Sequence, residues 1–566
     1  MRLRASDDGN RGWRPRNLLI IAALLAIALS GASGVASRIQ QEEPGPTAIP
    51  QVGGVYVEAM VGNPNAINPL LLQFNQTERD LSALLFTGLT KFDDNGLLVP
   101  DLAERWEIAD GGKSYTFYLR RDVRWHDRTP FTADDVVFSI KAMQAPDFQG
   151  SPEVADLWRG VGVEELDDYT IRFTLKEPFA PFLEYTTAGI LPRHLYSEST
   201  GKAMLTSPYN FRPVGTGPFK LTRISSEGIV LEPFADYYGP APRLSQMRFR
   251  FYPDYASALA ALEKGEVDGL PYLEPQDAVR LMASDRLTVY SAPDYQKYVI
   301  LLLNNSSPVF KEQAVRQAVA YAINKDRIVA TAMDGQAIPG KGPISPGSWA
   351  FNPKAKTYAY DPKKAESILE DAGWRDTNGD GIRDKNGVSL SFVILTNDNR
   401  RRIRAAELVA EDVRKIGFKV EVQAPAWADL LKEYLAPRTY LGALTEQWLL
   451  TADPDVQSLW SSKQIGNGGF NFSGMANDRA DQLLEEATRT VDTVRRTQLY
   501  SEFQDIWAEE IPSIILYYPM FNWGVSRNVQ GVRLTVLVDG SSRFRHVSEW
   551  YVRAGGAAQT GTPASR

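Results

Sequence analysis

The sequence of 566 residues contains no cysteine and only three histidines. The absence of cysteine excludes disulfide bonds, thiolate metal sites and cysteine nucleophiles. His126, His194 and His546 lie in no HExxH pattern and share no metal-ligand spacing, so we interpret each as a structural or surface residue. GxSxG and GxxxxGK[ST] patterns are also absent, so neither a serine-hydrolase elbow nor a P-loop is predicted.

Positive charge is not in excess either, since the net charge is -7 and the isoelectric point is about 5.4. This balance argues against a nucleic-acid partner. Hydrophobic residues make up 43% and charged residues 23% of the chain, which is typical of a folded globular protein. At roughly 150 residues per domain, the length predicts three or four structural units.

The chain has one marked apolar run near its start, at residues 18–29. Five arginines and two aspartates precede this run, and small, weakly polar residues follow it. A basic region, a short apolar core and small residues are typical of a secretory signal. We predict that residues 1–37 are a signal peptide or an uncleaved membrane anchor and that residues 38–52 are a linker. The Gly-, Ala-, Ser- and Thr-rich residues 553–566 are expected to be a disordered tail.

Residues 84–140 alternate turns with regular elements. Asp101 and Glu104 have the spacing of a capping pattern, which predicts a short helix there. Tyr115, Phe117 and Leu119 alternate with polar neighbours, which predicts a strand with one buried face. Thr132 precedes an apolar run with acids in its first turn, which predicts a helix N-terminus.

The later chain continues the alternation of strands and helices, which predicts an α/β fold with mixed sheets. Strands are expected near residues 55–59, 171–175, 299–303 and 418–422, and helices near 257–263, 310–322, 361–372 and 403–416. The Gly-Thr-Gly-Pro run at 215–218 predicts a tight turn in which Gly217 adopts a φ that other residues resist. This run lacks the third glycine of a dinucleotide-binding loop, so phosphate binding is not expected.

Residues 376–384, DTNGDGIRD, match the first nine positions of an EF-hand calcium loop. The twelfth position, which needs a bidentate glutamate, is Gly387, and a strand rather than a helix is expected after it. We therefore interpret the segment as a solvated hairpin loop, and calcium binding remains the alternative.

Six segments in order carry a family resemblance. They are TGLTKFDDNGLLVPDLAERWE at 87–107, YTFYLRRDVRWHDRTPFTADDVVFS at 115–139, GTGPFKL at 215–221, ALEKGEVD at 261–268, VRQAVAYAINKDRI at 315–328 and DPKKAESILEDAGW at 361–374. The chain resembles, from about residue 53 to 552, the extracytoplasmic solute-binding proteins of the peptide and nickel class, family 5, which serve ABC importers. Many of these relatives carry lipid on an N-terminal cysteine, which this chain lacks.

The resemblance implies a two-lobed fold of the periplasmic-binding-protein type, with mixed sheets, a hinge between the lobes and an extra subdomain in the first lobe. The chain is expected to cross between lobes near residues 296–298 and 517–518. The first lobe then comprises residues 53–295 plus 519–552, with the subdomain at 71–195, and the second comprises residues 299–516. Closure of the lobes on a hinge is expected to bury the solute.

The resemblance also implies where the solute binds. Trp427 and Trp448 match tryptophans of segments that line the family's cleft, and Tyr517 and Tyr518 follow an apolar strand at the second crossing. In peptide-binding members an aspartate three residues after the second tryptophan holds the peptide's ammonium group. Here Thr451 takes that position, and Asp453, two residues on, is the candidate substitute. A neutral hydroxyl does not offset a buried ammonium charge, so this difference argues against ordinary peptides.

We therefore predict an extracytoplasmic receptor subunit, periplasmic or on the cell surface, secreted or membrane-anchored. It is expected to bind a peptide or another small molecule as a monomer and to deliver it to an ABC permease. No catalytic residue, metal or cofactor is expected. The alternatives are a secreted hydrolase that uses a carboxylate pair and a solute sensor that transports nothing.

Overall fold

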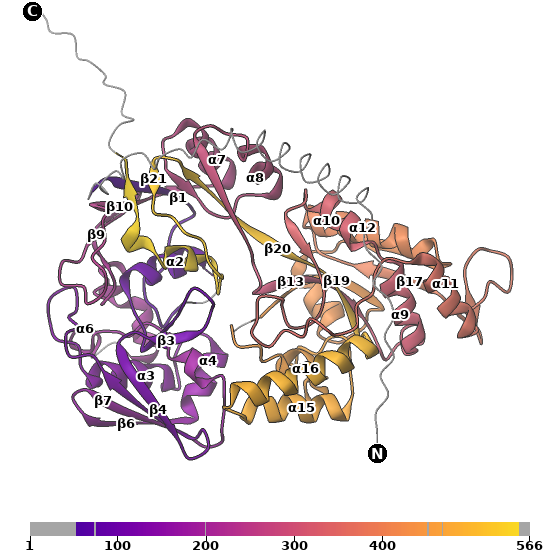
Figure 1. Cartoon of the computed structure of the whole chain (residues 1–566), viewed down its shortest axis with the longest axis horizontal. Coiled ribbons are helices and arrows are strands. Elements are labelled where there is room, and N and C mark those ends of the chain that lie inside the picture. Colours follow the sequence, from indigo (N-terminus) through magenta and orange to yellow (C-terminus); the bar gives the residue numbers. More distant parts are fainter. Residues whose placement is uncertain (1–52, 73–74, 198–199, 450–451, 467, 554–566) are drawn as a thin grey trace, which may run out of the picture. The chain divides into compact units, whose positions relative to one another are not determined.

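The computed structural model describes residues 53–72, 75–197, 200–449, 452–466 and 468–553 (Figure 1). The expected signal or anchor at 1–37, the linker at 38–52, Thr451 and residues 554–566 of the expected tail lie outside the described residues. Among the described helices, none is both long and apolar enough to cross a membrane.

One twelve-stranded mixed sheet runs through the described chain in the order β18-β17-β19-β13-β20-β11-β1-β10-β9-β8, and β12 and β14 pair with β20 beside this path. The bounds are β1 Val55–Val61, β8 Phe219–Ser225, β9 Gly228–Pro233, β10 Gln246–Tyr252, β11 Gly269–Leu270, β12 Leu287–Pro293, β13 Lys297–Leu303, β14 Ala337–Pro339, β17 Ser391–Leu395, β18 Lys419–Gln423, β19 Gly442–Trp448 and β20 Ser513–Ser526. The pairs β1–β10, β1–β11, β17–β18 and β17–β19 are parallel, and the other pairs are antiparallel.

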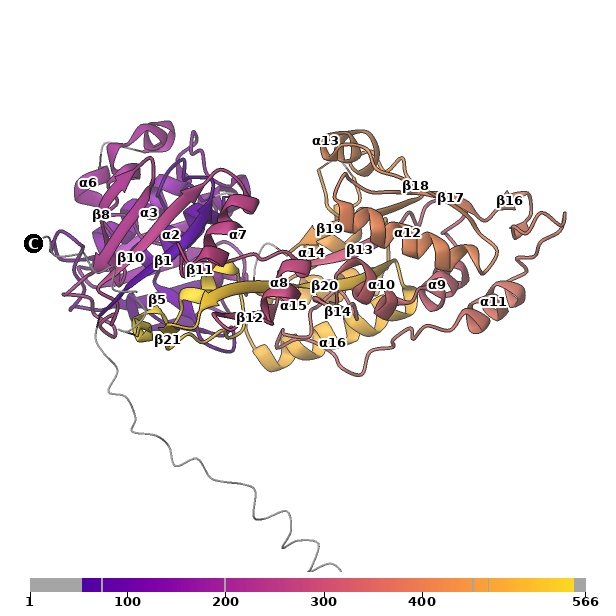
Figure 2. The ribbon, with the colours of Figure 1, turned by 90° about the horizontal axis from the view of Figure 1, so that it is seen from above.

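Strand β20 links two groups of strands, and Figure 2 shows it as one long strand. Its first half pairs with β13, where Val299 lies opposite Tyr517. Its second half pairs with β11 and β12, where Val289 lies opposite Gly524. Fourteen residues of nearly continuous apolar sequence are typical of a strand covered on both faces, and nearly all of them are buried.

Two large buried apolar clusters flank this strand. The first core extends from Tyr56 to Phe249 and adds Phe521 to Trp550, and the second core extends from Tyr298 to Tyr518. A smaller cluster packs α7 (Tyr255–Lys264) and α8 (Pro275–Leu281) against β1, β11 and β12. Gly265 ends α7 with φ +75°, a conformation that favours glycine.

A four-stranded antiparallel sheet in the order β4-β5-β7-β6 belongs to the first core. Its strands are β4 Ala103–Ala109, β5 Ser114–Leu119, β6 Val161–Asp167 and β7 Thr170–Leu175, and its helices are α3 Ala133–Gln144 and α4 Pro152–Arg159. The strand at 115–119 and the helix that Thr132 precedes are confirmed. The backbone N–H of Thr132 donates to the Asp135 carboxylate at 3.1 Å.

The short helix expected after Asp101 is wrong, because residues 103–109 form β4. Trp106 pairs with Phe117 of β5, so sheet pairing outweighs the local capping pattern. Asp101 is held elsewhere, since it accepts from Lys91 Nζ at 3.2 Å and from Tyr238 Oη at 2.7 Å.

The Gly-Thr-Gly turn is also explained differently from the sequence prediction. Gly217 is not among the glycines with positive φ. An added Cβ at Gly217 would lie 2.4 Å from the Leu84 carbonyl oxygen, and one at Gly215 would lie 1.8 Å from the Leu85 oxygen. Close packing against α2 (Gln76–Leu85), rather than backbone torsion, therefore requires glycine here.

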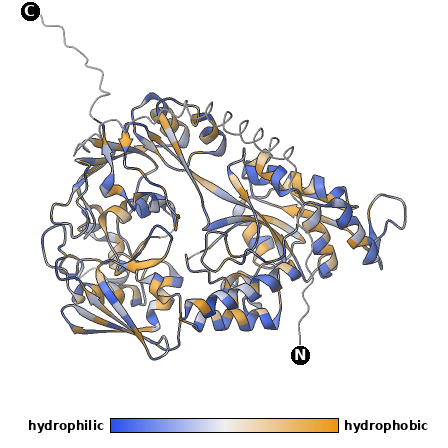
Figure 3. Ribbon diagram, viewed as in Figure 1, coloured by the Kyte–Doolittle hydropathy of each residue, from blue (hydrophilic) through white to orange (hydrophobic). Residues whose placement is uncertain are grey.

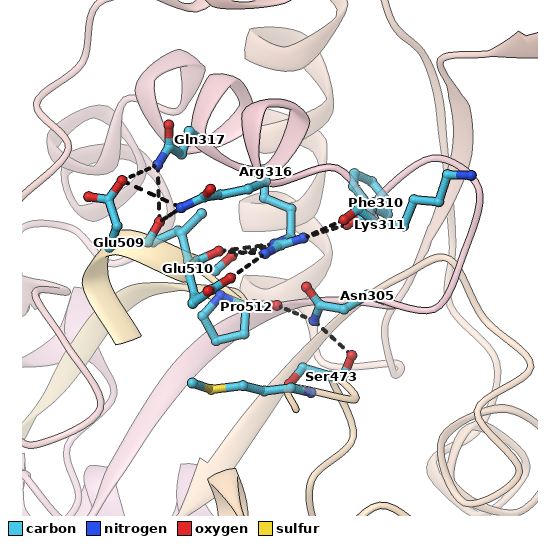
Figure 4. A network of polar contacts seen from close by, with 12 residues as sticks. Asn305, Phe310, Lys311, Arg316, Gln317, Ser473, Glu509, Glu510 and Pro512 are labelled. Atoms are coloured by element: carbon cyan, nitrogen blue, oxygen red, sulfur yellow. Dashed lines mark hydrogen bonds and ion pairs between the residues drawn. The ribbon is translucent and has the colours of Figure 1, made fainter. Parts of the chain in front are cut away.

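Helices of the second core are α9 Gln313–Ala322, α10 Lys325–Ala332, α11 Pro362–Asp371, α12 Arg400–Arg414, α15 Asp478–Arg489 and α16 Thr493–Glu510. Arg316 of α9 is buried, and its Nη2 donates to the Glu510 carbonyl oxygen at 2.8 Å, at the end of α16 (Figure 4). Its Nη1 donates to the Phe310 carbonyl oxygen at 2.9 Å. One guanidinium thus satisfies carbonyl groups from two segments far apart in the chain.

Hydrophilic and hydrophobic residues alternate along α15 and α16 (Figure 3). Leu483 and Leu484 of α15 are buried, whereas Arg479 pairs at the surface with Glu502. This distribution is typical of helices that cover one face of a core.

The remaining elements are shorter. They are β2 Thr90–Phe92, β3 Leu98–Pro100, α5 Phe182–Tyr185, α6 Arg193–Tyr196, β15 Asp384–Lys385, β16 Val388–Ser389, α13 Trp427–Asp429, α14 Gln457–Trp460, β21 Val529–Gln530 and β22 Tyr551–Val552, with 3₁₀ turns at Gly201–Thr206, Pro208–Phe211, Ser462–Gln464, Gly540–Phe544 and Val547–Glu549 and a π turn at Leu430–Leu435.

Candidate functional site

Three parallel strands of the second core end at one edge of the main sheet. β17 pairs in parallel with both β18 and β19, so their carboxyl ends face the same way. Trp448 is the last residue of β19, and Trp427 begins α13 four residues after β18. Each tryptophan is 47% exposed. Two strand spacings separate β18 from β19, or about 10 Å, so the sheet presents two exposed aromatic rings along this edge.

Charged side chains occupy the same edge. α12 follows β17, and the Asn399 side chain caps it by accepting from the N–H groups of Arg401 and Arg402 at 3.1 Å each. Arg402 forms an ion pair of 3.4 Å with Glu446 on β19. Arg401 pairs with Glu274, which precedes α8 and so lies beside the smaller apolar cluster.

Lys297 completes this edge at the start of β13. Its Nζ lies 4.9 Å from the centroid of the Trp448 ring and 3.1 Å from the Asp294 carboxylate. The contact with the ring fixes one face of Trp448 beside a cation. The edge therefore combines aromatic surface with charges of both signs.

A cavity of about 60 Å³ lies beside this edge. Its lining comes from both cores and from the segments between them: Asn95, Gly96, Val536, Leu537 and Val538 on one side, and Tyr295, Gln296, Pro343, Ile344, Ser345, Gly347, Ser348, Trp349, Leu449, Ala452, Asp453, Pro454 and Val456 on the other. Most of these side chains are apolar, and Asp453 is the only carboxylate among them. At roughly 15 Å³ per water, the space holds about four water molecules, so a larger solute requires the lining segments to separate.

The Asp453 carboxylate is paired. Its two oxygens accept from Arg496 Nη1 at 2.8 Å and Nη2 at 2.6 Å. Both side chains are largely buried, and Arg496 also donates to the Ala487 carbonyl oxygen at 3.0 Å. Burial alone lowers the pKa of Arg496, but the hydrogen bonds and charge of Asp453 raise it overall. This pair anchors the loop after Trp448 to α16.

Glu184 of α5 contacts the same loop from the other side. Its carboxylate accepts hydrogen bonds from the backbone N–H groups of Ala452 and Asp453, the latter at 2.7 Å. Burial raises the pKa of Glu184 to about 8, although the two backbone hydrogen bonds lower it. α5 packs in the first core and the loop follows β19 of the second core, so this contact joins the two.

The profile of the bacterial extracellular solute-binding proteins, family 5 (middle region), matches residues 98–469. The oligopeptide-binding protein AppA of Bacillus subtilis (strain 168) is 31% identical over 527 residues, which cover 91% of this chain and 95% of that protein. The chain belongs to this family.

Three further comparisons agree with this assignment. The dipeptide-binding protein of Escherichia coli (strain K12) is 30% identical over 86% of this chain and 93% of its own length. The crystal structure of NikZ from Campylobacter jejuni with Ni(L-His) superposes with a TM-score of 0.69 at 28% identity, covering 89% of this chain and all of that chain. That of AppA from Bacillus subtilis with a nonapeptide gives a TM-score of 0.68 at 29% identity over the same shares of both chains.

The two-lobed α/β fold of the periplasmic-binding-protein type is thus confirmed, as is the expected role of this family 5 protein as the substrate-binding subunit of an ABC importer. Members of the family are extracytoplasmic solute receptors rather than enzymes. Nothing in the comparisons favours the hydrolase alternative.

The residues predicted to contact the solute do not all line the cavity. Trp427 and Trp448 lie at the exposed sheet edge, although Leu449 rather than Trp448 lines the cavity. Asp453 lines the cavity, but Arg496 holds its carboxylate, which weakens the hypothesis that it binds a solute ammonium. Thr451 lies outside the described residues.

Tyr517 and Tyr518 do not line the cavity, and both are almost fully buried in the second core. The Tyr518 hydroxyl donates to the Gly342 carbonyl oxygen at 2.7 Å, next to the lining segment that begins at Pro343. In this conformation the two tyrosines support the lining rather than form it. Their direct contact with solute stays a prediction.

Each of the three histidines makes its own polar contacts at a different place in the fold. His126 Nδ1 accepts from the Gly215 N–H at 3.1 Å, while Nε2 lies 3.1 Å from the Gly217 oxygen. His194 contacts Asp127 at 2.7 Å and His546 contacts Asp94 at 2.6 Å. Within the described ranges, no group of three or more histidines and acids is arranged to hold a metal ion.

Sequence reasoning missed Glu184 and Arg496. Neither lies in a motif, and with 69 acids in the chain a single glutamate gives no signal. The only clue to Asp453 was its loop position after Trp448, and the sequence did not indicate its partner 43 residues away.

Proposed function

We propose that this protein captures a small solute, peptide-like or otherwise, between its two lobes and delivers it unchanged to an ABC permease. One observation carries the proposal: a single cavity is lined by residues 95–96 and 536–538 of the first-lobe side and by residues 343–345, 347–349, 449, 452–454 and 456 of the second. A site built from two cores forms only when they approach each other, which is the geometry of a closing receptor.

The proposed lobe boundaries follow the two apolar clusters. The second core begins at Tyr298 and ends at Tyr518, which supports crossings near 296–298 and 517–518. The first lobe would comprise residues 53–295 plus 519–552, with a subdomain at 71–195, and the second lobe residues 299–516. The pairing of β20 with β13 and then with β12 supports the proposal that this strand is one of the two connections.

The chemistry of the cavity favours an uncharged, apolar group on the solute. Trp349, Leu449 and Leu537 exemplify its lining, and its one carboxylate is engaged by Arg496. The relatives named above bind oligopeptides, dipeptides or Ni(L-His), so peptides remain the reference class. The family resemblance places an ammonium-holding aspartate where this chain has Thr451, so peptides with free amino termini should bind weakly. A missing charge partner of this kind costs roughly 2–4 kcal/mol, or on the order of thirtyfold to a thousandfold in affinity.

We further propose that the protein acts outside the cytoplasmic membrane as a monomer and carries no lipid. The signal-like residues 1–37 and the absence of cysteine support this location. Fractionation of the native host should recover it outside the cytosol without acylation. Recovery of the mature protein in the cytosol, or with lipid attached, would contradict the proposal.

Mass spectrometry of small molecules that co-purify with the native protein tests the function directly. The expected result is a solute that is recovered chemically unchanged after prolonged incubation with excess protein and that binds again in calorimetry. A solute converted to product at a rate proportional to protein concentration would instead establish an enzyme. N-acetylated and free-amine versions of one peptide provide the matched comparison, with the acetylated form expected to bind more tightly.

A further inference from the structure

A segment of the first core, residues 178–185, lies against the second core. The N–H of Ala180 donates to the Thr488 carbonyl oxygen at 2.7 Å. The segment follows β7 and contains α5. The Glu184 carboxylate accepts hydrogen bonds from the backbone N–H groups of Ala452 and Asp453 in the loop of the second core. Nearby, an added Cβ at Gly112 would lie 2.7 Å from Val491 Cγ1, so the two surfaces are in close contact there as well.

The loop that Glu184 holds is the loop that lines the cavity. Ala452, Asp453 and Pro454 are all lining residues, and Arg496 holds the other side of the same loop through Asp453. The position of the loop is therefore set by two hydrogen bonds from Arg496 of its own core and by two hydrogen bonds to Glu184 of the opposite core. Of these four hydrogen bonds, the two to Glu184 are the ones that break when the cores separate.

The charges around Glu184 are unbalanced. Asp453 faces it from the second core, and Arg496 of α16 is the cation that acts on it. Asp455 lies beside Asp453 and is acted on by the same arginine. Tyr185 on its own helix lies within range of both aspartates and of Glu153 on α4, and Tyr115 of β5 lies near Arg496. Three carboxylates thus share one arginine where the two cores meet.

We propose that Glu184 is a proton-sensitive latch, a positioning residue that fixes the solute-facing loop at 452–453 when the lobes close and that favours closure in its protonated form. The device goes beyond solute capture itself, because it operates in the protein without solute. It couples the acidity outside the membrane to the fraction of closed receptor.

The sign of the effect follows from the environment of Glu184. In the closed structure burial raises the pKa of Glu184 to about 8, whereas its ordinary value is 4.5 once the cores separate and water reaches it. Closing therefore takes up a proton between these limits, and acid favours the closed form. Lowering the pH from 8 to 6 should raise the closed-to-open ratio roughly tenfold to a hundredfold.

Asp455 is not expected to produce this response. Burial raises the pKa of Asp455 to about 6. However, it accepts from the Gln457 N–H at 3.0 Å and lies 3.5 Å from Thr488 Oγ1, and both partners belong to its own core. These contacts persist when the lobes open.

Spin-label distance measurements on the solute-free protein test the latch. The natural chain has no cysteine, so cysteines introduced at Leu205 and Val494, which are 47% and 70% exposed, are the only labelling sites. At pH 6 the shorter distance between the labels, which marks the closed form, should dominate. At pH 8 the ratio of the shorter to the longer distance should be roughly tenfold to a hundredfold lower. Glu184→Ala should give the longer distance at both pH values, because both bonds to the loop are lost.

Glu184→Gln decides between a proton switch and a merely structural contact. Glutamine cannot titrate, so its distance distribution should be the same at pH 6 and pH 8. Glu177→Gln is the matched control, since Glu177 lies seven residues before Glu184 and pairs with Lys113 at 3.6 Å, within the first core; it should behave as the natural protein does. A wild-type response that survives in Glu184→Gln would overturn the proposal, as would the absence of any response in the natural protein.

Discussion

Two clusters of this protein each gather carboxylates around one arginine, yet they differ in how the parts are joined. Arg543 donates to Glu58 at 2.7 Å and to Asp80 at 2.6 and 2.9 Å, and all three side chains are buried within the first core. Arg496 donates to the carboxylate of Asp453, which belongs to the same core, while Glu184 reaches the cluster from the opposite core by accepting from backbone N–H groups.

The difference shows how similar charges serve different ends. In the Arg543 cluster, burial raises the pKa of Glu58, and Arg543 lowers it in opposition, so each charge has an opposite partner in place permanently. In the Glu184 cluster, the glutamate accepts from backbone N–H groups, no arginine of the described chain donates to it, and these backbone partners separate from it when the lobes open. The first arrangement connects α2, β1 and the C-terminal segment, whereas the second responds to its surroundings.

The largest effect is expected when the permanent cluster is broken. Arg543→Met should lower the free energy of unfolding by about 3–5 kcal/mol, because two carboxylates remain buried without a cation. Urea denaturation at pH 7 measures the change. Arg533→Met is the matched control, since Arg533 pairs with Glu549 at 2.6 Å but both side chains are about half exposed; a loss below about 1 kcal/mol is expected there.

If the free energy of unfolding of Arg543→Met lies within 1 kcal/mol of that of the natural protein, the Arg543 cluster contributes specificity rather than stability. The two clusters then do not differ as proposed.

The second prediction concerns the loss of folding stability in acid, which is separate from the proposed closure of the lobes in acid. Burial lowers the pKa of His126 to about 4 from its ordinary 6.5, and the Gly215 N–H donates to its neutral ring. Its contribution is present above pH 6.5 and is lost as the pH falls toward 4, because the unfolded state then binds a proton that the folded state excludes. Between pH 7 and pH 4 the natural protein should lose about 3 kcal/mol from this group.

Chemical denaturation of His126→Asn should show this loss reduced, since the asparagine oxygen accepts a hydrogen bond without titrating. His194→Asn should retain it, because His194 lies beside Asp127 near the surface. Acid would then weaken the first core while it strengthens the proposed latch, which keeps the two processes distinguishable. An acid response equally strong in His126→Asn would show that other groups carry it.

Much of the architecture could be predicted from local pattern, and its exceptions have a common cause. Alternation predicted β5, and Thr132 with its acidic first turn predicted α3. β4 was missed because its pairing with β5 outweighs the capping pattern at Asp101, and Gly217 was required by the approach of α2 rather than by its own torsion. Each exception depends on a segment distant in sequence.

The candidate site was only partly accessible for the same reason. Trp427 and Trp448 follow strands, so their position at a sheet edge was predictable from order alone. The pairing of Asp453 with Arg496 and the approach of Glu184 depend on the packing of α16 and α5, for which neither spacing nor composition gives a signal.

A smaller effect is expected at the exposed sheet edge. Trp448→Ala should weaken binding of the co-purified solute by about 1–3 kcal/mol, or roughly fivefold to a hundredfold and more, because an aromatic face is lost from the proposed site. Calorimetry with that solute measures it. Ile108→Ala on β4, another exposed apolar side chain at 41%, should leave the affinity unchanged. Equal affinity in Trp448→Ala for every identified solute would remove this edge from the binding site.

The smallest effect is expected where carboxylates are most exposed, in the loop at 376–384. Asp376 accepts from the N–H groups of Gly379 at 2.7 Å and Gly381 at 2.9 Å, and these hydrogen bonds lower its pKa. Asp384 accepts from Thr377 Oγ1 at 2.7 and 2.8 Å. The carboxylates are thus occupied by the loop's own donors, and Gly387 stands where a calcium loop needs its glutamate.

Thermal midpoints measured with calcium and with chelator should therefore agree within a few degrees, and Asp376→Asn should change neither value by more than that. In this loop every carboxylate is satisfied locally and in water, so neither a cation nor a distant core is needed to balance its charge. Glu184 is neither exposed to water nor satisfied by donors of its own segment, so its protonation is expected to matter. A clear rise of the midpoint with calcium in the natural protein, absent in Asp376→Asn, would show that the exposed loop is a binding site and that exposure alone does not separate inert acids from functional ones.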